Sequence, residues 1–114
     1  MTFLEELNSV LVTLNIPLET GVFSDEPPDE YLVITPMTDS FYMFADNKPN
    51  YTLSEARLSL FSKGNYIQRK KEITNVLLAA GFTITDRNYV GYEEDTKYHH
   101  YAIDVMKEYE EEDK

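Results

Sequence analysis

The sequence contains no cysteine, only four glycines and no long apolar run. Without cysteine the chain can form neither a disulfide nor a thiolate metal site, and a reducing compartment suits it. No apolar stretch approaches the roughly 20 residues that a membrane-spanning helix needs. The opening "MTFLEELNSV" also lacks the basic region and continuous apolar stretch of a secretory signal. We therefore expect a soluble, intracellular protein.

Basic residues are scarce as well, with 10 Lys and Arg against 21 Asp and Glu, for a formal charge of -11. Such a chain is repelled by phosphates, which argues against a protein that binds nucleic acid through a basic face. Residues 61–92 nevertheless contain five basic and two acidic residues, whereas residues 1–60 contain two basic and ten acidic ones. One short basic segment therefore interrupts an acidic chain.

Two helices are predicted from capping residues and apolar spacing. Thr2 and Glu5 fit a capping box, and the apolar residues that follow recur at helical spacing until Pro17. Asn65 is placed to cap a second helix, which Gly81 is expected to end.

Strands are predicted between and after these helices. They are a short edge strand within Pro17–Ser24, a buried strand Tyr31–Thr35 ended by Pro36, Arg57–Phe61, and a hairpin of Phe82–Tyr92 with Tyr98–Glu108. "SDEPPDE" (residues 24–30) is expected to be an exposed loop, and "FYMFADNKPNY" (residues 41–51) a turn or long loop. The order predicts one α+β domain over residues 1–108, with a mostly antiparallel sheet of about four to five strands and two helices packed on one face. Residues 109–114 are expected to form an acidic, disordered tail.

The sequence offers no recognisable catalytic chemistry. His99 and His100 are adjacent on a predicted strand, so their side chains point to opposite faces, and His100 lies far from Asp104 for joint capture of a metal. There is no thiol, no serine in a strand-to-helix elbow and no glycine-rich phosphate loop. We expect no catalytic, cofactor or metal site, and hence a protein that is not an enzyme.

Aromatic residues are abundant, with nine tyrosines and six phenylalanines, more than a core of this size can enclose. Tyrosine suits protein interfaces because it combines a large apolar body with a polar tip. The candidate subunit interface consists of Phe41, Tyr42, Phe44, Tyr51, Lys63, Arg69, Lys70, Lys71, Tyr89 and Tyr92. The alternatives are an aromatic sheet face packed under its own loops and a solvated basic helix face.

Four stretches resemble a known family. They are "FADNKP" (residues 44–49), "LFSKGNY" (residues 60–66), "AAGFTITDRNYVGYEEDT" (residues 79–96) and "YHHYAIDV" (residues 98–105). Together they are similar to small structural proteins of long-tailed bacteriophages and prophages of Gram-positive bacteria, and the size and element order resemble their tail terminator or tail-completion proteins. The resemblance implies a hexameric ring that caps the tail tube, with the chain itself, the major tail protein and head–tail connector proteins as partners. It also implies a location in the host cytoplasm during assembly and then in the virion tail or neck.

Two other functions remain open at this point. A neck or head-completion protein has a similar size and a neighbouring gene. From a different class, an acidic phage protein of this size could mimic DNA and inhibit a host protein by occupying its nucleic-acid site.

Overall fold

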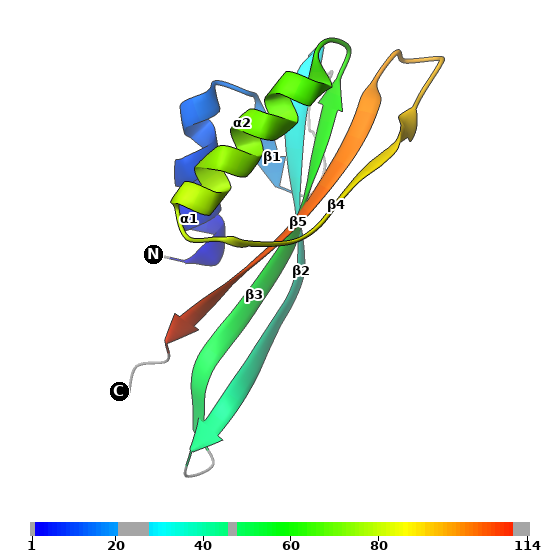
Figure 1. The fold of residues 1–114 in the computed structure, drawn as a ribbon. Coiled ribbons are helices and arrows are strands. Elements are labelled where there is room, and N and C mark those ends of the chain that lie inside the picture. Colours follow the sequence, from blue (N-terminus) through cyan, green and yellow to red (C-terminus); the bar gives the residue numbers. More distant parts are fainter. Residues whose placement is uncertain (1, 21–27, 46–47, 111–114) are drawn as a thin grey trace.

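The computed structural model describes residues 2–20, 28–45 and 48–110, with the backbone alone for residues 38–45, 48–50 and 110. It consists of a five-stranded sheet and two helices, which confirms the predicted α+β fold (Figure 1). The helices are α1 (Phe3–Leu11), continued by the 3-10 turn η1 (Val12–Leu14), and α2 (Tyr66–Ala79). The strands are β1 (Leu18–Thr20), β2 (Glu30–Ala45), β3 (Lys48–Ser62), β4 (Thr83–Tyr92) and β5 (His99–Glu110). Their order in the sheet is β1-β2-β3-β5-β4, and all neighbours are antiparallel except β1 and β2.

Local hydrogen bonds explain where the helices begin and end. The Thr2 hydroxyl and the Glu5 carboxylate each accept a backbone N–H from the other residue at 3.2 Å, which confirms the capping box. The Asn65 side chain accepts the N–H of Gln68 at 3.1 Å at the start of α2. Gly81 follows α2 with φ of 89°, a left-handed conformation that glycine adopts without strain.

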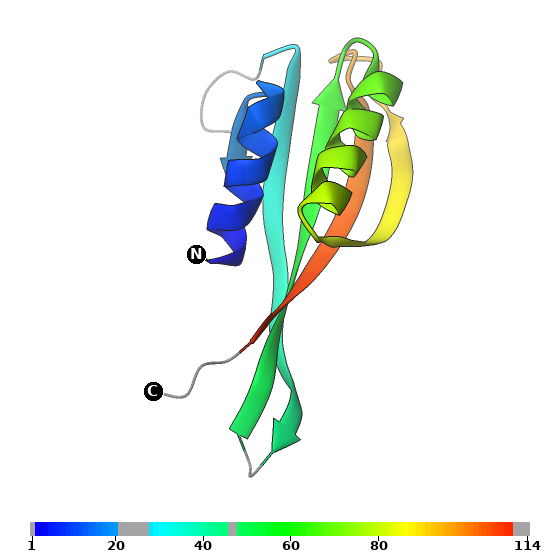
Figure 2. The ribbon, with the colours of Figure 1, turned by 60° about the vertical axis from the view of Figure 1, so that its left-hand side comes forward.

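Both helices lie on the same face of the sheet (Figure 2), and the main core fills the space between these layers. Its fully buried members include Leu7 and Leu11 of α1, Ile34 of β2, Leu58 and Leu60 of β3, Ile73 and Leu77 of α2 and Ile103 of β5. Leu58 and Leu60 point into this core, whereas Arg57, which directly precedes Leu58 on the same strand, is exposed, as the alternation of the sequence predicts. No helix in the described part of the chain is long and apolar enough to cross a membrane.

The central hairpin is much longer than the sequence predicts. β2 does not end at Pro36 but continues to Ala45, and residues 41–51, expected as a turn or loop, belong to β2 and β3 except for residues 46–47, which lie outside the described residues. Leu32 donates its N–H to Pro17 on the β1 side, so the backbone of Pro36, four residues on, also faces away from β3. A proline there removes no hydrogen bond of the β2–β3 ladder, and the register shift at Met37 absorbs the irregularity.

The far part of this hairpin extends beyond the helices. We call residues 38–45 of β2 and 48–55 of β3 the arm. β5 accompanies β3 as far as the pair Tyr51 and Glu110, and past that point the arm consists of β2 and β3 alone within the described residues. The molecule consequently measures 55 × 26 × 24 Å, and neither α1 nor α2 covers the arm (Figures 1 and 2).

The carboxyl-terminal strand passes the domain boundary expected at residue 108. Tyr109 is half-buried in β5, contacts Phe3 edge-on and donates its hydroxyl to Glu6 at 2.9 Å. Lys107 forms an ion pair with the same carboxylate. The strand therefore belongs to the folded domain up to Glu110, and residues 111–114 and most of the expected loop, residues 24–27, lie outside the described residues.

Candidate assembly surfaces

The structure separates the predicted interface residues into two groups at opposite ends of the molecule (Figure 1). The backbone of Phe41, Tyr42, Phe44 and Tyr51 lies in the arm, where Tyr42 pairs with Tyr51 across the hairpin. The remaining candidates lie around the start of α2 and the ends of β3 and β4. The predicted residues therefore do not form one continuous patch.

Arg69 differs most from its expected role as an exposed basic residue. Its Nε donates to Glu30 at 2.7 Å, and its Nη1 donates to Glu72 at 3.1 Å and to the carbonyl of Leu14 at 3.3 Å. Its side chain is only 28% exposed. The guanidinium thus links α2 to β2 and to the end of η1, and it is a structural residue of this chain.

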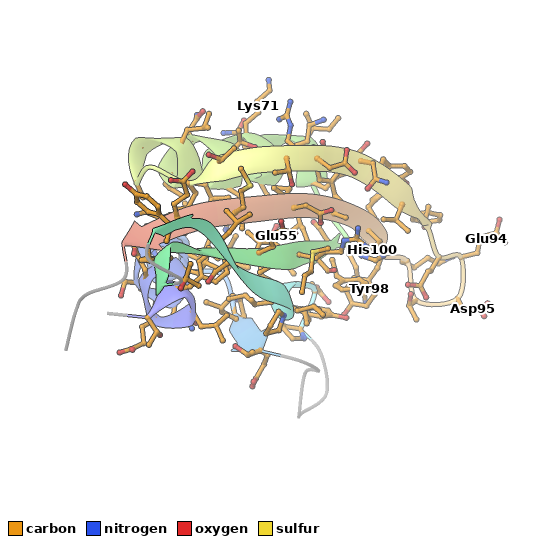
Figure 3. The ribbon with its side chains drawn as sticks, turned by 90° about the horizontal axis from the view of Figure 1, so that it is seen from below. Glu55, Lys71, Glu94, Asp95, Tyr98 and His100 are labelled. Atoms are coloured by element: carbon orange, nitrogen blue, oxygen red, sulfur yellow. The ribbon has the colours of Figure 1, made fainter. Side chains whose placement is uncertain are left out.

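Lys63 and Lys70 also have partners within the chain. Lys63 lies 3.6 Å from Asp29 and over the ring of Tyr98, and Lys70 lies over the ring of Tyr101 at 4.9 Å. Lys71 is exposed and points away from the sheet (Figure 3), and no carboxylate of the described residues lies within ion-pair distance of it. Lys71 is therefore the cation of this helix that has no ion pair or aromatic partner among the described residues.

Tyr89 and Tyr92 belong to an aromatic cluster at the same end of the molecule. The Tyr89 hydroxyl lies 2.9 Å from Nδ1 of His99, and Tyr66 stacks on the His99 ring with centroids 4.8 Å apart. Tyr92 contacts the same ring at 4.8 Å. His99 therefore has a structural role in holding these rings together.

Four exposed apolar side chains lie at this end of the molecule, and we call them the end patch. Its members are Ile67, Tyr89, Val90 and Tyr92, and each is between 44% and 55% exposed. Ile67 and Val90 were missed among the interface candidates. Val90 occupies a register shift in β4 that alternation does not predict, whereas the place of Ile67 outside the apolar arc of α2 is a signal that could have identified it.

The second histidine lies on the sheet face away from the helices. The rings of Tyr31, Phe61 and His100 stack across β2, β3 and β5, with centroids 4.8 and 4.3 Å apart. Tyr98 packs edge-on against the first two rings and lies near His100 (Figure 3). Nε2 of His100 is buried and finds no hydrogen-bond partner among the described residues. Burial lowers the pKa of His100, and Arg57 lowers it further while Glu93 opposes the shift.

The positions of these residues bear directly on the catalytic and metal hypotheses. His99 and His100 point to opposite faces of the sheet, as predicted. In residues 2–20, 28–45 and 48–110, no three His, Asp or Glu side chains converge to hold a metal ion. Tyr31, Phe61 and Tyr98 fit the alternative interpretation of the aromatics, because they pack together on a largely covered sheet face.

No protein-family model and no curated protein matches the sequence of this chain. The geometry itself defines two unlike surfaces, the arm at one end and the end patch with Lys71 at the other. Two unlike surfaces on one molecule can join copies head to tail.

Proposed function

We propose that this chain is a structural assembly protein of a long-tailed bacteriophage or prophage, a tail terminator that caps the tail tube as a ring and joins it to the head connector. The observation that carries the proposal is the arm, which extends a regular hairpin beyond the part of the molecule that the helices cover. The resemblance of residues 44–108 to phage structural proteins supports it independently.

The arm has the properties of a contact element. A two-stranded hairpin is at best marginally stable in water, and it usually needs a third strand or a packed face. β5 supplies a third strand only as far as the pair Tyr51 and Glu110. The core lies in the other half of the molecule, so the arm is not required to complete it. A partner that packs on the arm would provide the missing support.

The surfaces at the two ends also suit a ring. A contact between unlike surfaces is heterologous, and repeated heterologous contacts close into a ring when the rotation between copies allows it. Six copies would form the hexamer that the resemblance implies, with the major tail protein and head–tail connector proteins bound at the ring. The net charge of -11 would let DNA pass through such a ring with little adhesion, because like charges disfavour contact with phosphates.

A DNA mimic is the less favoured alternative. Such a protein needs free carboxylates spaced along one face, but Glu6, Glu30, Glu72 and Asp104 are engaged in ion pairs within the chain. Glu94 and Asp95 are exposed, but they lie together in the turn between β4 and β5 (Figure 3).

Deleting the gene in a phage or prophage that carries it tests the proposal. Electron microscopy should then reveal aberrantly long tails that lack heads, and supplying the intact chain should restore virions. Tails of normal length that fail to join heads would indicate the neck or head-completion protein instead. Normal virions at normal yield would exclude an assembly role and would favour the DNA mimic as the function of this chain.

A second variant tests the arm itself. Residues 41–52 are replaced by Asn-Gly, a dipeptide that closes tight hairpins, so that Ser40 and Leu53, which already pair, flank the new turn. The short-armed chain should fold, as judged by circular dichroism and a cooperative melt, yet fail to restore virions to the deletion. Full restoration of virions by this variant would show that the arm is not required for the proposed function.

A further inference from the structure

We propose that the outer edge of β2 in the arm of one copy pairs with the outer edge of β4 in the next copy, so that the sheet continues from copy to copy. The inference rests on the self-assembly proposed above, and it names the two surfaces that meet. Both are backbone edges to which a strand can be added, a common mode of protein association.

The edge of β2 is long and regular. β1 pairs only with Leu32–Ile34, and from Thr35 to Ala45 no other described strand lies on this side of β2. β3 keeps an unbroken register with β5, so the alternation of its backbone groups fixes that of β2 beyond the shift at Met37. The N–H groups of Asp39 and Phe41 consequently face outward, away from β3.

The edge of β4 is the opposite edge of the same sheet. β4 pairs with β5 alone among the described strands. Glu93 donates its N–H to Tyr98, and the register from there places the backbone groups of Asn88 toward β5 and those of Arg87 and Tyr89 outward.

Natural edge strands are normally protected by charges, prolines or bulges, because they offer unpaired N–H and C=O groups to any other strand. β4 has register shifts near both of its ends, yet its exposed side chains include Tyr89, Val90 and Tyr92 of the end patch. An exposed edge with apolar side chains is a surface for a partner.

The strand directions allow this pairing without turning either copy over. β2 and β5 run in one direction and β3 and β4 in the other. Copies that stand side by side in the same orientation therefore bring β4 against an antiparallel β2, the more stable arrangement. Because the arm lies beyond the core along the strand direction, the copies are staggered, as strands are in closed barrels.

Formal charge favours this partner over a second arm. Residues 38–55 contain three acidic residues, Asp39, Asp46 and Glu55, and one basic residue, Lys48. α2 and β4 together contain four basic residues, Arg69, Lys70, Lys71 and Arg87, against Glu72 and Asp86. Two arms side by side would repel, whereas α2 and β4 together present a net positive formal charge to an arm.

Cysteine cross-linking of purified full-length protein tests the contact, and the absence of native cysteine makes each product unambiguous. Met43→Cys and Arg87→Cys variants are mixed and oxidised with glutathione disulfide, and Phe41→Cys and Ala45→Cys replace the first partner to cover neighbouring registers. Facing positions of antiparallel strands lie within the Cα separation that a disulfide spans. A Val12→Cys variant, exposed on η1 and on neither edge, provides the control.

We expect the mixed disulfide between one arm position and residue 87 to form in several-fold excess over every pair that includes residue 12. Phe41→Pro, placed in the Met43→Cys chain, should abolish that excess because it removes an outward N–H, whereas Phe41→Ala should retain it. Cross-linking no greater than in the control, or no loss with proline, would overturn the proposal. So would a predominance of Met43→Cys homodimers, which would indicate two-fold pairing of arms.

This assay involves no virions, so its result is separable from that of the gene deletion. A tail defect without the cross-link would retain the proposed function and exclude this contact. The cross-link without any tail defect would retain the contact and exclude the function.

Discussion

Replacing Arg69 by methionine should lower the free energy of unfolding by about 2 kcal/mol, since hydrogen bonds to charged groups contribute roughly 1.5–3 kcal/mol. The guanidinium bonds to Glu30, Glu72 and the carbonyl of Leu14, and methionine keeps the apolar stem while it removes all three bonds. The Arg69 and Glu30 side chains are 28% and 27% exposed, so solvent screening keeps the value in the lower part of that range.

Thermal and urea denaturation measure this loss. For a domain of about 100 residues, 2 kcal/mol corresponds to a fall of about 8 °C in the melting temperature. Lys71→Met is the matched control, because Lys71 is a basic residue of the same helix that is exposed and lacks a carboxylate partner among the described residues. It should change stability by less than about 0.5 kcal/mol.

Equal stability of the two variants would refute the structural role of Arg69 and return it to the interface candidates. The same reasoning decides which charge reversal is informative for assembly. Arg69→Glu would place a third carboxylate beside Glu30 and Glu72 and damage the fold, whereas Lys71→Glu alone leaves the core contacts intact.

Three further outcomes are expected. His100→Phe should preserve the stack on Phe61, remove the unpartnered Nε2 and raise the free energy of unfolding by about 1 kcal/mol, measured in urea; a loss of stability would mean that Nε2 has a partner. Although burial alone would raise it, hydrogen bonds from Lys107 and Tyr109 lower the pKa of Glu6 below its ordinary value of 4.5. Its stabilisation should therefore be complete above pH 4.5 and disappear as the pH falls through the lowered pKa, so that the native chain and Glu6→Gln converge in acid; a constant difference would contradict this. Removing every residue after Glu110 should leave the melting temperature unchanged or higher, because three of the four lost residues are acidic; a fall of many degrees would show that they are docked.

Features decided by neighbouring residues could be predicted from the sequence. The caps at Thr2 and Asn65 each depend on a residue three positions away, and strand alternation alone separates His99 from His100. These interactions are local, so spacing along the chain is sufficient to identify them.

Features decided by packing or pairing between distant residues could not be predicted from the sequence. Arg69 is drawn inward by Glu30, which lies on a strand 39 residues earlier, and no local pattern reveals that contact. Pro36 suggested a strand end because the sequence does not indicate on which side of β2 its missing N–H lies. The arm was interpreted as a loop because asparagine and proline around residues 46–50 favour turns, and strand length beyond a core depends on pairing.

The continuity of β2 and β3 has a mechanical consequence. The same two strands that carry Ile34, Leu58 and Leu60 in the core continue into the arm without a connecting loop. The arm is therefore connected to the core rigidly and not through a flexible linker. A force applied at the far end of the arm acts as a torque on the strands beneath α1 and α2. In the described part of the hairpin, the ladder between the two strands is irregular only at Met37, and bending concentrates there. A partner that holds the arm restricts this bending in the strands that continue into the core. Binding at the arm should therefore slow the exchange of backbone amides in the core of the same molecule, at positions that no partner touches.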